Sequence, residues 1–210
     1  GRLSSSEPNL QNIPIRTTEG VTIREAFVAS EGKKILAMDY SQIELRLMAH
    51  YSKDQIMLDS FKNNEDIHKR TASEVFSVEM EDVTDEMRRR AKTINFGLLY
   101  GMSAFGLSNQ LSVSRAEAEE FLLNYFAKYS SVKVFMKDVV EQAKKDKYVS
   151  TLYGRKIHVP NIESPNYMLR QASERAAVNG PLQGSAADII KRAMINIFKE
   201  SGKNEKDVKM

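Results

Sequence analysis

The residues best suited to chemistry form a stripe along one predicted helix. Arg88, Lys92, Phe96 and Tyr100 stand four residues apart, and a step of four turns an α-helix only about 40° past a full circle. Guanidinium and ammonium groups bind phosphate, and aromatic rings stack on flat ligands. Two cations followed by two rings therefore favour a ligand with a phosphate end and a ring end, such as a nucleotide, and the nearby Gly101 leaves space for it. A partly buried helix with charges at one end is the alternative.

A second candidate site lies where a short apolar run ends. The run 35–38 has the pattern of a buried strand and is followed by Asp39. A carboxylate at that position can hold a hard cation, with the backbone carbonyl of Tyr40 beside it. Glu44, in the helix that follows, could face the same cleft. The simpler alternatives are that Asp39 ends a strand and caps the next helix, and that Glu44 stabilises the first turn of that helix.

Other polar residues have the types that contact nucleic acid. His68 stands beside Lys69 at a predicted helix start and could touch a phosphate, although an ordinary surface histidine fits the same pattern. Arginine, asparagine and glutamine bond base edges and backbone oxygens. Residues of these types recur at four-residue steps late in the chain and in its polar opening segment: Arg175, Asn179 and Gln183, and Arg2, Asn9, Gln11 and Asn12. A solvent-facing polar edge explains either group equally well.

The composition narrows the class of protein. The chain has 210 residues, 41% of them hydrophobic and 28% charged, which fits one globular unit or slightly more and excludes a disordered tail or a disulfide scaffold. It has no cysteine, which excludes thiolate zinc sites and fits a reducing compartment. The net charge of +3 is compatible with a protein that binds nucleic acid, but it does not require such binding. No apolar run approaches the ~18 residues of a membrane span, so we expect no membrane partner.

Helices must position most of these side chains. The patterns predict an α+β fold in which helices dominate. Expected caps are Ser41, Asp66, and Ser114 in a capping box with Glu117. The expected helices cover 42–51, 67–76, 84–99, 115–129 and 132–147, and a last helix after Pro165 is interrupted at Gly180-Pro181.

Two hairpins are predicted as well. The β-like runs 22–29 and 34–39 enclose a turn at Glu31-Gly32, and the runs 149–152 and 156–159 enclose a turn at 153–155. The first hairpin would place Asp39 at the edge of a small sheet.

Two stretches resemble motifs A and B of the DNA polymerase I family (family A). They run from Asp39 to Arg46 (Asp-Tyr-Ser-Gln-Ile-Glu-Leu-Arg) and from Arg88 to Gly101. The opening segment 1–14 and the sequence Gly-Ser-Ala-Ala-Asp at 184–188 match the same family, and the resemblance covers nearly the whole chain. It implies a right-hand architecture with mostly helical fingers, residues 53–165, and a small, incomplete antiparallel palm sheet. Residues 1–52 and 166–210 would be palm, and a thumb would be absent.

The resemblance also implies a role for each matched residue. Asp39 and the Tyr40 carbonyl would bind catalytic Mg²⁺, of which the complete enzyme holds two ions. His68, Arg88 and Lys92 would hold the triphosphate of a dNTP, and Lys92 would protonate the leaving pyrophosphate. The remaining nucleotide contacts would come from Tyr40, Gln42, Glu44, Phe96 and Tyr100, with Glu44 blocking a 2′-hydroxyl. The contacts to primer-template DNA would come from Arg2, Asn9, Gln11, Asn12, Arg175, Asn179 and Gln183.

The chain departs from the family in one motif. The second catalytic carboxylate of the family lies in a His-Asp-Glu sequence, and none of His50, His68 and His158 is followed by Asp-Glu. We therefore expect DNA-templated DNA synthesis, in replication and repair, from the complete protein and no useful polymerase activity from this chain alone. The incomplete palm could pair with a second copy of the chain. The expected location is the bacterial cytoplasm, at the nucleoid.

Two other functions stay open. The chain could be a non-catalytic module that binds DNA or nucleotide. It could also come from a single-subunit RNA polymerase, a class that shares the metal-binding aspartate and the Arg/Lys/Tyr stripe. Glu44 and Phe96 favour the use of deoxynucleotides, which argues against the RNA polymerase alternative.

Overall fold

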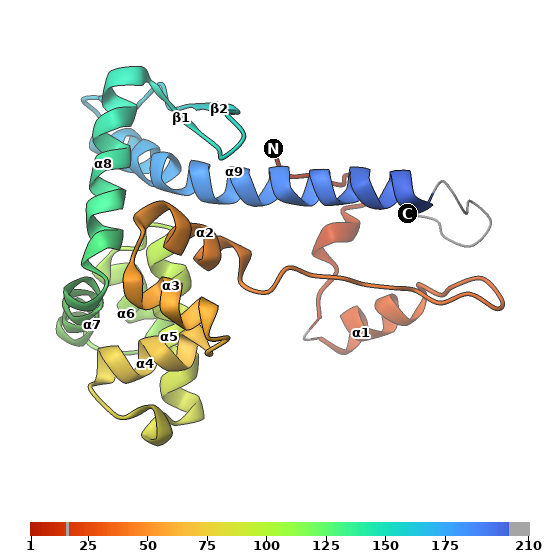
Figure 1. The fold of residues 1–210 in the computed structure, drawn as a ribbon, viewed down its shortest axis with the longest axis horizontal. Coiled ribbons are helices and arrows are strands. Elements are labelled where there is room, and N and C mark those ends of the chain that lie inside the picture. The colour runs from red at the N-terminus through yellow and green to blue at the C-terminus, as the bar shows by residue number, and fades with distance from the viewer. Residues whose placement is uncertain (16, 202–210) are drawn as a thin grey trace. The chain divides into compact units, whose positions relative to one another are not determined.

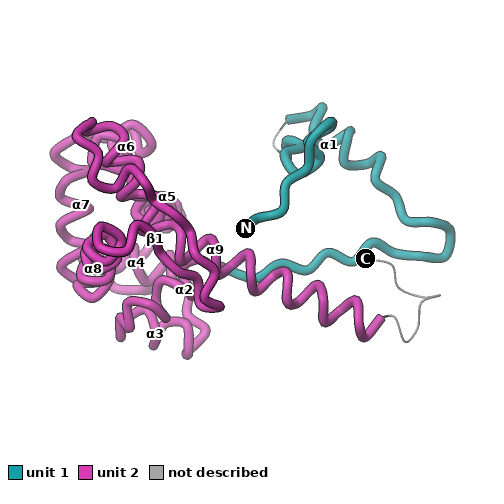
Figure 2. The backbone as a smooth tube through the Cα atoms, turned by 90° about the horizontal axis from the view of Figure 1, so that it is seen from above, with its two compact units in different colours: residues 1–41 teal, residues 42–210 magenta. Residues whose placement is uncertain are grey.

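The chain folds as two compact units. The computed structural model describes residues 1–15 and 17–201 (Figure 1), and the units comprise residues 1–41 and 42–210 (Figure 2). Residues 202–210, the end of the second expected palm segment (166–210), lie outside the described residues.

The first unit contains no strand among its described residues, so both predicted strands of the first hairpin are wrong. It has a short 3-10 helix, η1 (Leu10–Asn12), and one α-helix, α1 (Thr18–Glu25). Helix wins over strand in α1 because the Thr17 side chain accepts from the Gly20 N–H at 3.1 Å, and because an acidic residue in the first turn and a basic one in the last suit the helix dipole.

The segment 34–39 is extended but pairs with no strand of the described chain. A strand needs a neighbour to accept its backbone hydrogen bonds. Without one, the run that the sequence predicts as buried lies in solvent: Leu36 is 78% and Met38 71% exposed. The turn at Glu31-Gly32 does form, with Gly32 at φ +72°.

The second unit is almost entirely helical, which confirms the predicted fold class. Its α-helices are α2 (Ile43–Ser52), α3 (Gln55–Lys62), α4 (Ile67–Phe76), α5 (Asp85–Leu99), α6 (Ala104–Leu111), α7 (Arg115–Lys128), α8 (Ser130–Asp146) and α9 (Tyr167–Ser201), and a 3-10 turn, η2 (Met80–Asp82), precedes α5. The sheet of the described residues is the predicted second hairpin. Its strands β1 (Tyr148–Ser150) and β2 (Lys156–His158) run antiparallel with Val149 opposite Ile157.

Two of the three predicted caps are confirmed. Asp66 caps α4, and Ser114 and Glu117 form the capping box of α7. Ser41 does not cap α2, because the position before that helix is taken by Gln42 in the left-handed region, at φ 54° and ψ 37°. Ser41 therefore stands one residue too early to meet the first turn.

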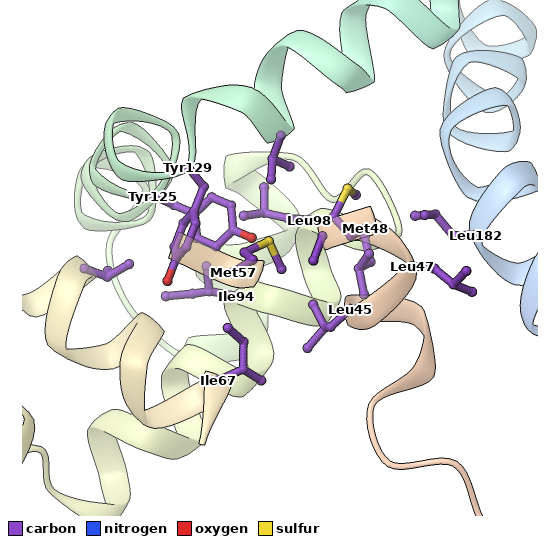
Figure 3. Close-up of a cluster of buried hydrophobic side chains, with 14 of the residues drawn as sticks. Leu45, Leu47, Met48, Met57, Ile67, Ile94, Leu98, Tyr125, Tyr129 and Leu182 are labelled. Atoms are coloured by element: carbon purple, nitrogen blue, oxygen red, sulfur yellow. The ribbon is translucent and has the colours of Figure 1, made fainter. Parts of the chain in front are cut away.

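The core of the second unit takes buried side chains from all of its helices, α2 to α9, with Ile67 contributed by α4 (Figure 3). It is built from buried side chains that recur at helical spacing, among them Leu45, Met48, Met57, Ile94, Leu98, Tyr125, Tyr129 and Leu182. A smaller cluster around Val149, Val159 and Ile162 packs the hairpin onto α8 and α9. These contacts fix α4 and α5, which carry the candidate site.

Helix α9 continues through Pro181, so the predicted interruption at Gly180-Pro181 is wrong. An interior proline destabilises a helix by about 3 kcal/mol. Here the residues on both sides of Pro181 are packed against other parts of the unit, which offsets this cost. Leu182 is 1% exposed, and a Cβ added at Gly180 would lie 2.8 Å from Val149 Cγ2. Only glycine lets the hairpin approach α9 this closely, and this packing keeps α9 helical on both sides of Pro181.

Candidate nucleotide-binding site

The predicted stripe is confirmed as one side of α5. Arg88, Lys92 and Phe96 lie on the helix and Tyr100 is its C-cap residue. The opposite side is anchored in the core, since Ala91 and Ile94 are completely buried. The exposure differs along the stripe: Lys92 is exposed, Arg88 and Phe96 are half-buried, and Tyr100 is 39% exposed.

Arg88 is held by a carboxylate that the sequence did not link to it. Its Nε donates to Asp66 Oδ2 at 2.6 Å, while Asp66 Oδ1 accepts from the backbone N–H groups of His68 and Lys69 at the start of α4. Burial pushes the pKa of Asp66 upward, but these hydrogen bonds outweigh it and lower the pKa below its ordinary value. The guanidinium is thus oriented between α4 and α5.

His68 is buried, so the alternative of a surface histidine is wrong. It is 3% exposed, and its ring centroid lies 5.8 Å from that of Phe96. Burial lowers the pKa of His68 to about 4, an effect reinforced by Arg88 and Lys92 and opposed by Asp66. The imidazole is therefore neutral at pH 7 and lies beside two cations.

The aromatic end of the stripe meets α2. The rings of Phe96 and Tyr100 stack with centroids 6.4 Å apart and planes 18° apart. The Tyr100 hydroxyl donates to Glu44 Oε2 at 3.1 Å. Glu44 therefore lies against the stripe, and Gln42 stands two residues before it at the start of α2. The expectation that Glu44 shares a cleft with Asp39 stays a prediction.

The space expected at Gly101 is already filled by the chain itself. Gly101 has φ +65°, and a Cβ added there would lie 2.6 Å from Arg175 Cγ. The row Arg175, Asn179 and Gln183 of α9 therefore starts beside the aromatic end of α5. Along this row Arg175 is exposed, and Asn179 and Gln183 are half-buried.

The other candidate residues belong to the first unit. Asp39 and Tyr40 are exposed in the extended segment, and the expected position of Asp39 at a strand end is not observed. Arg2, Asn9, Gln11 and Asn12 are also exposed, the last two within η1. Over residues 1–15 and 17–201, no group of three or more His, Asp or Glu side chains gathers as a metal site.

The sequence analysis did not identify three buried polar residues that lie next to His68 as part of the site. Thr71, Asn95 and Tyr129 are at most 1% exposed and join the histidine in one hydrogen-bonded cluster. The one sequence feature that could have indicated this cluster is an asparagine inside the motif B helix, on the side that faces the core.

In the described part of the chain, no helix is both long and apolar enough to cross a membrane.

Comparison with known proteins gives a consistent assignment. The sequence model of DNA polymerase family A matches residues 1–210. The chain is 56% identical over 205 residues to DNA polymerase I of Pseudomonas aeruginosa, covering 96% of this chain and 22% of that protein. It is 52% identical over 198 residues to DNA polymerase I of Geobacillus stearothermophilus, covering 94% and 23%.

A solved structure is similar over the same region. The POL domain of Pol1 from M. smegmatis, in complex with DNA primer-template and dNTP, superposes with a TM-score of 0.89 at 50% identity, covering 98% of this chain and 36% of that one. The chain thus spans less than a quarter of the length of these curated relatives. On these matches over nearly all of its residues, the chain belongs to DNA polymerase family A.

Proposed function

We propose that the stripe of α5 binds the triphosphate of a dNTP, and that the complete protein is a DNA-templated DNA polymerase. The observation that carries the proposal is the joining of a cationic end to an aromatic end on one helix, with His68 beside it. The M. smegmatis domain, which is similar over nearly the whole chain, was solved with primer-template and dNTP. The whole protein's polymerase activity is inferred from this similarity.

The cationic end suits a polyphosphate. Phosphoryl transfer needs positioning and charge neutralisation more than covalent help. Arg88 offers an oriented guanidinium because Asp66 fixes it. Lys92 offers an exposed ammonium on the same side, and as an acid it would give one proton to the pyrophosphate oxygen that leaves.

The aromatic end suits the nucleoside. Phe96 would stack near the sugar and Tyr100 would lie beside the templating base. Glu44, held by the Tyr100 hydroxyl, would occupy the space that a ribose 2′-hydroxyl needs and so select deoxynucleotides. The row on α9 that begins beside Gly101 would contact the duplex, together with Arg2, Asn9, Gln11 and Asn12.

Asp39 and the Tyr40 carbonyl would hold Mg²⁺. Their chemistry fits this ion, because Mg²⁺ takes one or two carboxylates and completes its shell with water and substrate phosphates, and the Asp39 carboxylate is exposed. When bound, the metal would activate the primer 3′-hydroxyl and stabilise the leaving pyrophosphate. The prediction that Asp39 and the stripe of α5 serve the same nucleotide stays a prediction.

We also propose that the chain is divided into palm and fingers segments, as the family resemblance implies. Residues 1–52 and 166–210 would be palm and residues 53–165 fingers. The expected location is the bacterial cytoplasm at the nucleoid, where the DNA is. Self-association is supported by the extended segment 34–39, whose Leu36 and Met38 side chains are exposed, because an unpaired extended backbone can pair with another chain.

Nucleotide binding tests the proposal directly. The 210-residue chain should bind dATP with Mg²⁺ and should not bind deoxyadenosine measurably, because the phosphates supply the contacts. Lys92→Ala should weaken dATP binding about tenfold, the loss of one charged hydrogen bond. Isothermal titration calorimetry measures both effects. The matched control is Lys145→Ala, an exposed lysine of α8, which should bind as the parent chain does.

Equal binding of deoxyadenosine and dATP, or an unchanged affinity after Lys92→Ala, would contradict the triphosphate site. The same preparations with primer-template should bind dATP without extending the primer. Extension by this chain would contradict the expectation that a His-Asp-Glu carboxylate is required.

A further inference from the structure

Four buried polar side chains from α4, α5 and the end of α7 form one hydrogen-bonded cluster. It runs from the backbone carbonyl of Ile67 through Thr71 and Asn95 to the imidazole of His68, and Tyr129 joins it at Thr71. Thr71 and Tyr129 are completely buried and Asn95 is 1% exposed. The polar groups of Thr71, Asn95 and Tyr129 therefore depend on partners inside the protein.

The direction of each hydrogen bond follows from one fixed acceptor. The Thr71 hydroxyl has a single proton and two acceptors within reach, and Ile67 O at 2.8 Å is closer than Asn95 Oδ1 at 3.3 Å, so we assign the proton to Ile67 O. Its oxygen must then accept from its other neighbours. Asn95 Nδ2 lies 3.0 Å from Thr71 Oγ1, and the Tyr129 hydroxyl lies 3.4 Å from it.

The orientation of the Asn95 amide determines which ring nitrogen of His68 carries the proton. With Nδ2 turned toward Thr71, the second N–H of the same amide faces His68 Nδ1 at 3.1 Å. A ring nitrogen that accepts carries no proton, so the proton of the neutral ring resides on Nε2. The longer distance of 3.3 Å from Thr71 Oγ1 to Asn95 Oδ1 agrees with this orientation of the amide.

We propose that Asn95 is a positioning residue that fixes His68 as the tautomer protonated on Nε2, so that the ring has one N–H donor for a phosphate oxygen. The role toward phosphate rests on the proposed function, whereas the tautomer does not. A mixed population of tautomers would offer that donor only part of the time. A fixed tautomer also removes the cost of reordering the ring when a nucleotide binds.

Nitrogen-15 spectroscopy of the histidine rings tests the tautomer in the free chain. The sequence has three histidines, and His68→Gln identifies the signals of His68. At pH 7, long-range proton–nitrogen correlation should show His68 with an unprotonated Nδ1 and a protonated Nε2. The reverse assignment, or signals averaged between the two tautomers, would overturn the proposal without any variant.

Variants separate positioning from a merely structural role. Asn95→Asp should reverse the tautomer, because a carboxylate accepts a proton from Nδ1. The charged groups around His68 are Asp66 on its own helix and Arg88 and Lys92 on α5, and all three stay in place. Should Asn95→Asp not fold, Thr71→Val frees the amide to turn and should give averaged signals.

The matched control is Asn124→Leu, a half-buried asparagine of α7 that donates to Val75 O and should leave His68 unchanged. A retained Nε2–H form in both Asn95→Asp and Thr71→Val would overturn the role of Asn95. Adding dATP with Mg²⁺ should shift the Nε2 signal, and Asn95→Asp should weaken dATP binding about five- to tenfold. An Nε2 signal that ignores dATP would contradict the proposed function and leave the tautomer assignment intact.

Discussion

At the scale of single residues, the site depends on partners that lie far away in the sequence. The stripe of Arg88, Lys92 and Phe96 could be predicted because all three residues share one helix. The ion pair of Arg88 with Asp66 could not, because it joins two helices and Asp66 already has a local role as a cap. The same holds for His68, whose burial depends on contacts from α5 rather than on its own neighbours in sequence.

The buried His68 should make the stability of the chain depend on pH. Its pKa is lowered to about 4 from the ordinary 6.5, so between these values the unfolded chain binds more protons than the folded one. Stability from this group is complete above pH 6.5 and is lost as the pH falls toward 4. The full loss is at most about 3 kcal/mol. Urea unfolding at several pH values between 7 and 4 measures it.

The decisive comparison is with a variant that cannot titrate. His68→Gln should flatten the fall in unfolding free energy between pH 6.5 and 4. His158→Gln, at an exposed position on β2, should keep the dependence of the parent chain. If His68→Gln loses stability as steeply as the parent does, then His68 is not the group responsible.

At the scale of elements, one buried carboxylate begins two helices. Asp54 is the N-cap of α3, where it accepts from Met57 N at 3.2 Å. The backbone N–H of Ser131, in the first turn of α8, is also close enough to lower the pKa of Asp54, against the larger effect of burial, which raises it. The N-cap residue of α8, Tyr129, makes no side-chain cap. Asp54 therefore supplies from α3 the acceptor that α8 lacks.

Removing this carboxylate should cost more than an ordinary cap. Asp54→Ala leaves N–H groups of two helix starts without an acceptor at a site 3% exposed, and we expect a loss of about 2–4 kcal/mol in unfolding free energy. Asp54→Asn keeps an acceptor oxygen and should cost less than about 1 kcal/mol, because asparagine caps as well as aspartate. Urea denaturation compares them, and equal losses would contradict the double cap.

The elements also mark the limit of prediction from sequence. The capping box of Ser114 and Glu117 lies within four residues, and it is confirmed. The continuity of α9 through Pro181 and the cap of α8 by Asp54 both depend on packing between segments more than 30 residues apart. Local propensity describes only the first kind of feature, and tertiary contacts decide the second.

At the scale of the whole molecule, the two units differ in how much of their structure is buried. In residues 1–15 and 17–41, Gly20 is the one buried residue, and apolar side chains such as Leu36 lie in solvent. The unit of residues 42–210 contains the described core (Figures 2 and 3). Since opening costs little where little apolar surface is buried, the two units should open with very different free energies.

Amide hydrogen exchange should resolve this difference. Ile94 and Asn95 of α5 are buried at the centre of the core, so their amides should exchange only on near-global unfolding, several kcal/mol uphill. The α1 amides of Arg24 and Glu25 should open at almost no cost and exchange at least about a thousand times faster. Amides of α9 around Leu182 serve as an internal control, because they share the core and should follow α5. Protection of α1 equal to that of α5 would mean that residues 1–41 unfold together with the core, and that their exposed apolar side chains do not weaken that unit.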